Sequence, residues 1–179
     1  MRATARASSW CSRRHGGGPP DGGVRASPLG ARDTAREMSQ ENVEVVRKGI
    51  DAFNAFMRGE FALPVVEREI LDQQFEFHWH DERTYPDVPQ HLRGVPELIE
   101  FWEQLRSAWV DLAWEPLELI EAPDDRVVTP TRLSGRGLRS GGSIEVHFFL
   151  VWTIRDGRVR RMEVFRHRAE GLEAAGLRE

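Results

Sequence analysis

Two histidines stand one residue apart in the stretch QFEFHWHDE, which covers residues 74–82. An imidazole has an ordinary pKa of about 6.5, so it can move a proton near neutral pH, and it is also a common metal ligand. If the stretch is a strand, His78 and His80 share one face, where Glu76 or Glu82 could add a carboxylate. The spacing therefore indicates either acid/base chemistry or a metal site, depending on the surrounding elements.

The composition is typical of one globular domain. The chain has 179 residues, 40% hydrophobic and 30% charged, with a mean hydropathy of -0.51. Its net charge of -4 divides into +4 over residues 1–37 and -8 over the rest, which argues against a nucleic-acid partner. No apolar run approaches the roughly 18 residues of a membrane span. Cys11 is the only cysteine, so no intrachain disulfide forms and we expect a cytoplasmic protein.

Residues 1–37 differ from the rest of the chain. They are crowded with Arg, Gly, Pro and Ser and have no apolar periodicity. Such a segment cannot bury enough surface to offset the entropy lost on ordering, so we expect a disordered basic extension. A targeting segment is the alternative, but the Gly/Pro clusters oppose an amphipathic helix. The organised domain is therefore expected over residues 38–179.

The periodicity of residues 39–168 predicts an α+β fold. Apolar residues recur at helical spacing in three stretches, and they alternate in five others separated by Gly, Pro and Asp turn signals. The predicted helices are 39–59, 63–71 and 93–109. The predicted strands are 75–80, 109–122, 126–138, 143–155 and 158–168. Helices gathered early and a long antiparallel meander late exclude an alternating βαβ protein.

Five stretches carry a family resemblance: ENVEVVRKGIDAFNAFMRGE, QFEFHWHD, LRGVPELIEFWEQL, VWTIRDGRV and EVFRHRAEGLEAAGL. With this order of elements, residues 38–177 resemble the SnoaL-like, or nuclear transport factor 2-like, superfamily. The resemblance implies a cone-shaped α+β barrel whose three helices, in the N-terminal half, pack on a curved, mainly antiparallel sheet. It also implies an apolar pocket between helices and sheet. Relatives include steroid isomerases, epoxide hydrolases and polyketide cyclases.

The resemblance also implies which side chains face the pocket. Aligning the last hairpin turns Met162, Val164 and Arg166 toward it, unless a one-residue bulge exchanges the faces. Epoxide hydrolases keep a catalytic aspartate where this chain has Val164, and steroid isomerases keep an acid near Leu150. Both acids are missing here. The expected ligand-binding residues are Phe53, Trp102, Phe148, Leu150, Trp152, Met162 and Val164.

The same alignment places His78 near the carboxylate that moves a proton in steroid isomerases. His78 is therefore predicted as a general base or polar anchor, with Tyr85 and Arg166 as donors to a developing oxyanion. On this hypothesis the protein is a cofactor-free isomerase, cyclase or hydratase acting on a hydrophobic carbonyl or epoxide. The alternative is non-catalytic binding of a small apolar ligand, or a dimerising accessory module.

Two further expectations concern the outer face of the sheet. His147 and His167 fall there, away from the pocket, so no further histidine joins His78 and His80 in a closed site and no metal or cofactor is expected. The outer face also carries Phe149, Val151, Thr153 and Phe165, which form a surface too apolar to leave in water. We expect it to pair with a second copy of the chain in a homodimer, as the resemblance also implies.

Overall fold

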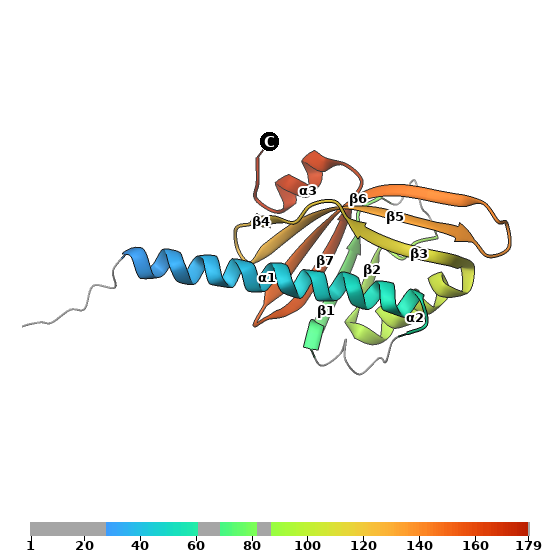
Figure 1. Cartoon of the computed structure of the whole chain (residues 1–179), viewed down its shortest axis with the longest axis horizontal. Coiled ribbons are helices and arrows are strands. Elements are labelled where there is room, and N and C mark those ends of the chain that lie inside the picture. Colours follow the sequence, from blue (N-terminus) through green and yellow to red (C-terminus); the bar gives the residue numbers. More distant parts are fainter. Residues whose placement is uncertain (1–27, 61–68, 82–86, 179) are drawn as a thin grey trace, which may run out of the picture.

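The computed structural model of the protein describes residues 28–60, 69–81 and 87–178, with side chains from residue 39 onward. Helices and strands follow one another in the order drawn in Figure 1. They are α1 (Pro28–Met57), β1 (Leu71–Trp79), β2 (His91–Arg93), α2 (Gly94–Ala108), β3 (Trp109–Pro116), β4 (Ile120–Ala122), β5 (Arg126–Gly137), β6 (Ser143–Arg155), β7 (Arg158–Phe165) and α3 (Arg168–Ala174). No helix in the described part of the chain is both long and apolar enough to span a membrane.

All seven strands belong to one sheet with the order β2-β1-β7-β6-β5-β3, and β4 pairs with β5 beside this path. The β1–β7 pair is parallel and the other pairs are antiparallel. The sheet twists over α1 and α2, while α3 lies near the chain end on the other side (Figure 1). The predicted α+β class with a curved, mainly antiparallel sheet is confirmed.

The two faces of the sheet bury two separate apolar clusters. The inner cluster joins α1 and α2 to side chains such as Val127, Leu150 and Met162. The outer cluster joins α3 to Val128 and Val151, the next residues along β5 and β6. Because successive side chains of a strand point to opposite faces, this alternation distinguishes an inner face, covered by α1 and α2, from an outer face, partly covered by α3.

The structure extends or corrects several predicted boundaries. The first helix begins at Pro28 and not at Ser39, so α1 overlaps the end of the predicted extension over residues 1–37. The division of the chain into this extension and a domain over residues 38–179 stays a prediction. The predicted helix 63–71 lies mostly outside the described residues, and Leu71 begins β1. The single strand predicted over 109–122 is two strands, β3 and β4, while β2 and α3 were not predicted.

Asn54 fastens α1 to the edge of the sheet. Its side-chain amide donates to the backbone carbonyl of Trp114 at 2.9 Å, and its Oδ1 accepts from the Trp114 backbone N–H at 2.8 Å. Trp114 lies on β3, the last strand of the sheet path, so among the described residues its outward backbone groups have no further strand to pair with. The amide of Asn54 takes the place of that strand and fixes α1 over the inner face.

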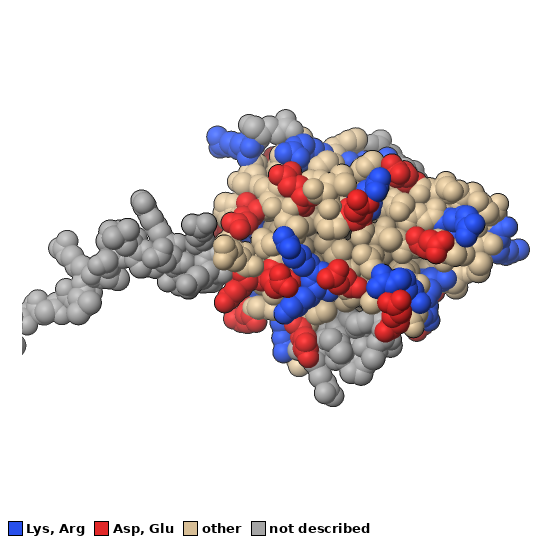
Figure 2. All heavy atoms as spheres, in the orientation of Figure 1, with Lys and Arg blue, Asp and Glu red and all other residues tan. Residues whose placement is uncertain are grey.

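Charged side chains of both signs share one face of the molecule. On the face shown in Figure 2, Lys and Arg lie interspersed with Asp and Glu. Several form cross-strand pairs: Arg132 on β5 contacts Glu115 on β3 and lies 3.8 Å from Glu145 on β6, and Arg136 lies 3.6 Å from Asp111. Exposed pairs of this kind contribute about 0 to 1 kcal/mol each, so they bear more on solubility than on the fold.

Candidate functional site

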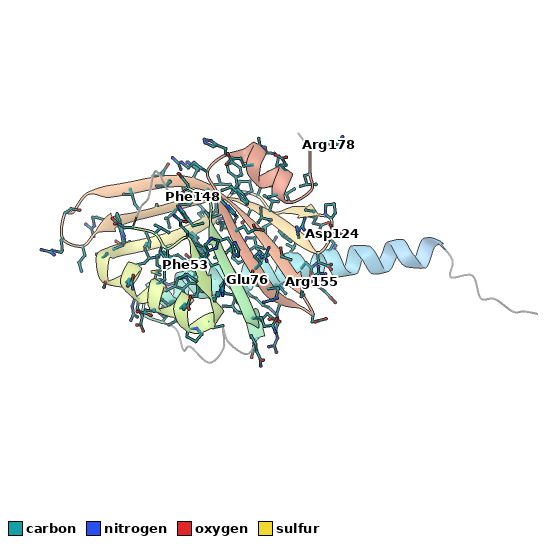
Figure 3. The ribbon with its side chains drawn as sticks, turned by 180° about the vertical axis from the view of Figure 1, so that it is seen from behind. Phe53, Glu76, Asp124, Phe148, Arg155 and Arg178 are labelled. Carbon is teal, nitrogen blue, oxygen red and sulfur yellow. The ribbon has the colours of Figure 1, made fainter. Side chains whose placement is uncertain are left out.

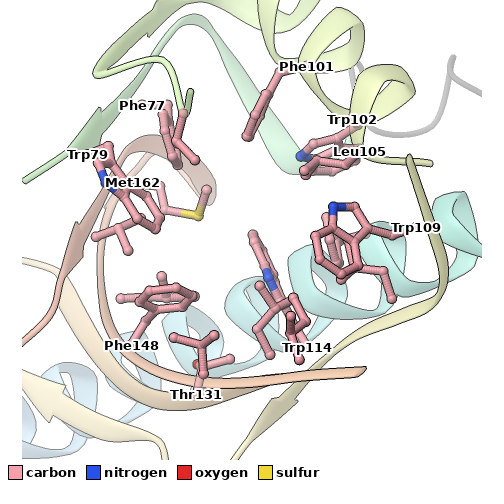
Figure 4. Close-up of a pocket in the computed structure, with 18 residues that line it drawn as sticks. Phe77, Trp79, Phe101, Trp102, Leu105, Trp109, Trp114, Thr131, Phe148 and Met162 are labelled. Atoms are coloured by element: carbon pink, nitrogen blue, oxygen red, sulfur yellow. The ribbon is translucent and has the colours of Figure 1, made fainter. Parts of the chain in front are cut away.

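A cavity of about 140 Å³ lies between the helices and the inner face of the sheet. Figure 4 shows its 18 lining side chains. Phe53 reaches it from α1 and Phe148 from β6, as the view in Figure 3 locates them. The aromatic lining residues are Phe53, Phe77, Trp79, Phe101, Trp102, Trp109, Trp114 and Phe148. Val88 and Phe101 also line a groove on the outside of the protein, so the cavity and this groove are neighbours.

The cavity wall carries very little polarity. Among the described residues that line it, none has an ionisable side chain. The polar groups are indole N–H groups and the hydroxyl of Thr131, and the hydroxyl donates to the carbonyl of Thr129 at 3.0 Å. The indole N–H of Trp79 donates to the carbonyl of Asp81 at 2.8 Å. These two donors are thus engaged with the backbone, and the wall apart from its other indole N–H groups suits apolar ligand atoms.

Aromatic contacts stiffen the helix side of the cavity. Phe53 stacks on Trp114 with ring centroids 4.0 Å apart and an interplanar angle of 14°. It meets Trp102 edge-on at 5.3 Å and 81°. Such pairs contribute about 0.5–1.5 kcal/mol each beyond the area they bury. Phe53 is fully buried, so α1, α2 and β3 meet around one ring.

Six of the side chains expected from the sequence to contact a ligand lie on this cavity: Phe53, Trp102, Phe148, Leu150, Met162 and Val164. The register expected for β6 and β7 is therefore the one observed. Trp152 lines a smaller neighbouring cavity instead, and its indole N–H donates to Thr129 Oγ1 at 2.8 Å. Phe77 and Trp79 were not among the expected ligand contacts, although the alternation in QFEFHWH places them on an apolar face.

His78 lies on the opposite face of β1 from the cavity, so its predicted position in the apolar pocket is wrong. In the parallel pairing of β1 with β7, Phe77 is opposite Met162 and Trp79 is opposite Val164, and all four line the cavity. Side chains alternate with period two, hence the residue between Phe77 and Trp79 must point outward. His78 is half-buried on the outer face of the sheet.

The outer face holds a cluster of titratable side chains around His78. His78 Nε2 lies 3.3 Å from Glu76 Oε2, and His80 Nε2 lies 3.3 Å from Glu163 Oε1. Arg161 donates to the same Glu76 oxygen from Nε at 3.1 Å and from Nη2 at 2.7 Å. These hydrogen bonds from Arg161 hold the pKa of Glu76 below its ordinary value, although partial burial opposes them.

Of the two residues predicted to donate to an oxyanion, the structure describes one. Tyr85 lies outside the described residues. Arg166 follows β7 directly, donates from Nη1 to the backbone carbonyl of His147 at 2.8 Å, and lies 5.8 Å from the ring centroid of Phe148. Arg166 is therefore adjacent to a lining residue without lining the cavity itself.

Comparisons with known proteins agree with this architecture. A family profile described as a SnoaL-like domain matches residues 68–162. This span begins just before β1 and ends within β7, so it contains most of the sheet and the whole of α2. Among curated protein sequences, none matches the chain.

Solved structures with the same fold have low sequence identity to this chain. An NTF2-like protein of unknown function from Burkholderia pseudomallei K96243 is 23% identical, with a TM-score of 0.57 over 75% of this chain and 97% of that one. A candidate SnoaL-like polyketide cyclase from Jannaschia sp. CCS1 is 22% identical, with a TM-score of 0.58 over 88% and 100%. TerC, co-crystallised with polyporic acid, is 21% identical, with a TM-score of 0.57 over 76% and 98%. At these identities the likeness concerns the fold.

Proposed function

Since the chain belongs to the family of SnoaL-like domains, we propose that its cavity binds one small apolar molecule with a flat ring system. One observation carries the proposal: the cavity of about 140 Å³ is walled by apolar and aromatic side chains, with no ionisable group among the described lining residues. A ligand that enters gains by leaving water and meets no charge that would need compensation.

The size and chemistry of the wall narrow the class of ligand. An apolar cavity of about 150 Å³ in another protein stays dry and binds benzene, so this volume suits at least one aromatic ring. Tryptophan and phenylalanine rings favour offset stacking or edge contacts with a second ring. TerC, a structural relative, was co-crystallised with polyporic acid, which supports a small-molecule role for a cavity in this fold.

Calorimetric titration with benzene, which a cavity of this volume can hold, tests the proposal, using the wild-type chain and a matched pair of leucine-to-tryptophan variants. Leu133→Trp adds a ring inside the cavity and is expected to weaken binding at least about tenfold, because it occupies the ligand's volume. Leu138→Trp is the control, since Leu138 is 58% exposed and does not line the cavity. No binding by the wild-type chain, or equal affinity in all three proteins, would reject the proposal.

A second candidate function is cofactor-free acid/base catalysis, as an isomerase, cyclase or hydratase on a hydrophobic carbonyl or epoxide. Arg166 supports it, because its guanidinium lies 5.8 Å from the ring centroid of the lining residue Phe148 and could approach a ligand oxygen. His78 is not the base in this version, since it faces away from the cavity. Tyr85 keeps its proposed donor role.

Turnover of apolar ketones and epoxides that bind in the titration tests this candidate. Arg166→Gln is expected to lower turnover at least about a hundredfold if Arg166 stabilises an oxyanion. Arg155→Gln serves as control, because Arg155 is exposed at the end of β6 and does not line the cavity. If the compounds bind but remain chemically unchanged over hours, catalysis is rejected and ligand binding alone remains the proposed function.

We also propose a homodimer through the outer sheet face, although less apolar surface is exposed there than the sequence predicted. α3 covers the apolar outer residues: Val151 is fully buried, and a Cβ added at Gly171 would lie 2.8 Å from Phe149 Cβ. The resemblance and the exposed β5–β6 surface beyond α3 support the dimer. Light scattering at micromolar concentration should give twice the mass of the 20.5 kDa chain, and a monomer would contradict it.

A further inference from the structure

Two histidines and one glutamate come together on the outer face of β1 and β7. One ligand atom from each of His78, His80 and Glu163 lies within 4.8 Å of the others. We propose that these three side chains bind one divalent transition-metal cation of the zinc type. The proposal does not depend on the apolar cavity, which lies on the other face of β1.

Strand pairing brings the three ligands together. His78 lies on β1 and His80 directly follows its last residue, so with alternating side chains both face outward. Glu163 lies directly opposite His78 in the parallel register between β1 and β7. The backbone N–H of His80 donates to the carbonyl of Val164 at 3.0 Å, which continues this pairing past the end of β1. The site is thus built on two rigid, hydrogen-bonded strands.

Ring contacts restrain both imidazoles. The His80 ring stacks on Phe165 with centroids 4.4 Å apart and an interplanar angle of 8°. The His78 ring meets His91 of β2 edge-on at 4.7 Å and 87°. Phe165 is buried under α3, so the surface against which His80 rests is itself fixed. Restrained ligands lose less rotamer entropy on binding a cation.

The hydrogen bonds and charges around each carboxylate indicate that Glu163, and not Glu76, is the carboxylate ligand. Glu76 Oε2 already accepts two hydrogen bonds from Arg161, and it also lies 3.3 Å from His78 Nε2. With the cation on Nδ1 of His78, Glu76 would accept from Nε2 and orient the ring, in the way that carboxylates commonly orient metal-bound histidines. Glu163 has His80 as its ion-pair partner at 3.3 Å, and a cation would replace that contact.

The dimensions fit a cation after small side-chain movements. Ligand atoms about 2.0–2.2 Å from a tetrahedral zinc ion lie about 3.4 Å apart, so separations that now reach 4.8 Å must close by up to about 1.4 Å. The side chains of His78, Glu163 and His80 are 23%, 19% and 38% exposed, so water can reach the open positions of the ion. Imidazole and carboxylate ligands suit zinc and its neighbours better than calcium or magnesium.

Zinc binding to the full-length, untagged chain tests the site. The protein is stripped with chelator, dialysed and titrated with Zn²⁺ by calorimetry, with bound metal counted by mass spectrometry. We expect one Zn²⁺ per chain, and NMR signals of the His78 and His80 rings that shift on binding. His80→Gln and Glu163→Gln each remove one ligand and should weaken binding by about tenfold or more, since even loss of an outer-shell partner costs about 10–100-fold.

Matched controls come from β6. His147→Gln and Glu145→Gln make the same two substitutions at exposed positions outside the cluster, and both should keep the wild-type affinity within about twofold. Circular dichroism checks that each variant is folded. If His80→Gln does not fold, the affinity of Glu163→Gln decides the test, because that substitution keeps the shape of the side chain. Absence of stoichiometric Zn²⁺, or equal losses in the β6 controls, would overturn the proposal.

Discussion

Replacing Val164 by aspartate is expected to destabilise the protein by about 4 kcal/mol at pH 7, because it buries a carboxylate in an apolar wall. Val164 is 3% exposed and pairs with Trp79 on one side and Leu150 on the other. A fully buried acid can have its pKa raised by about 3–5 units, and each unit corresponds to about 1.36 kcal/mol. Urea unfolding at several pH values measures the effect.

The pH dependence of this loss identifies its cause. The unfolded aspartate has a pKa of about 3.9, and burial raises the folded value above it. The penalty for ionisation is therefore absent below pH 4 and grows as the pH rises toward the folded pKa. Val164→Asn is the matched control, because it introduces a neutral polar group of similar shape whose cost should not vary with pH. Equal, pH-independent losses in both variants would contradict a buried charge.

The inner face of the sheet could be predicted from the sequence because period-two alternation is a local property. Once the last hairpin was aligned, Phe148, Leu150, Met162 and Val164 followed on one face. No bulge between these positions exchanges the faces; the irregularity in this strand pair falls between Thr153 and Ile154. The apolar wall was therefore foreseen from residues near in sequence to one another.

The position of His78 was mispredicted because two indications disagreed and the wrong one was preferred. Alternation in the strand puts His78 opposite to Phe77 and Trp79, whereas the resemblance suggested a site near a catalytic carboxylate. The local pattern was correct. An alignment can identify a strand without assigning which face a side chain occupies, since a shift of one residue reverses every face.

The partners of His78 could not be found from local patterns. Glu163 comes from β7, far along the chain, and meets His78 only because β1 and β7 pair in parallel. No turn or spacing in the sequence encodes that pairing. The same limit applies to α3, whose seven residues are too few for a periodic signal but cover the outer face and remove most of the apolar surface that had suggested a dimer.

Replacing Phe53 by alanine is expected to cost about 4 kcal/mol, since buried Phe→Ala substitutions typically cost about 3–5 kcal/mol. Phe53 is fully buried and contacts both Trp114 and Trp102, so its loss removes two ring pairs as well as buried area. The expected loss approaches the total stability of many domains, about 5–15 kcal/mol. Urea unfolding at 15 °C gives the free energy and the m-value.

Phe101→Ala is the matched control for that variant. Phe101 also lines the cavity, but it is half-buried and its ring lies 6.1 Å from Phe77, so we expect a loss of about 1 kcal/mol. Both variants enlarge the cavity, so naphthalene, which is bulkier than benzene, should bind each of them when they are folded. If Phe53→Ala cost no more than Phe101→Ala, the ring at position 53 would not join α1, α2 and β3, and the rigid cavity wall inferred from its contacts would be wrong.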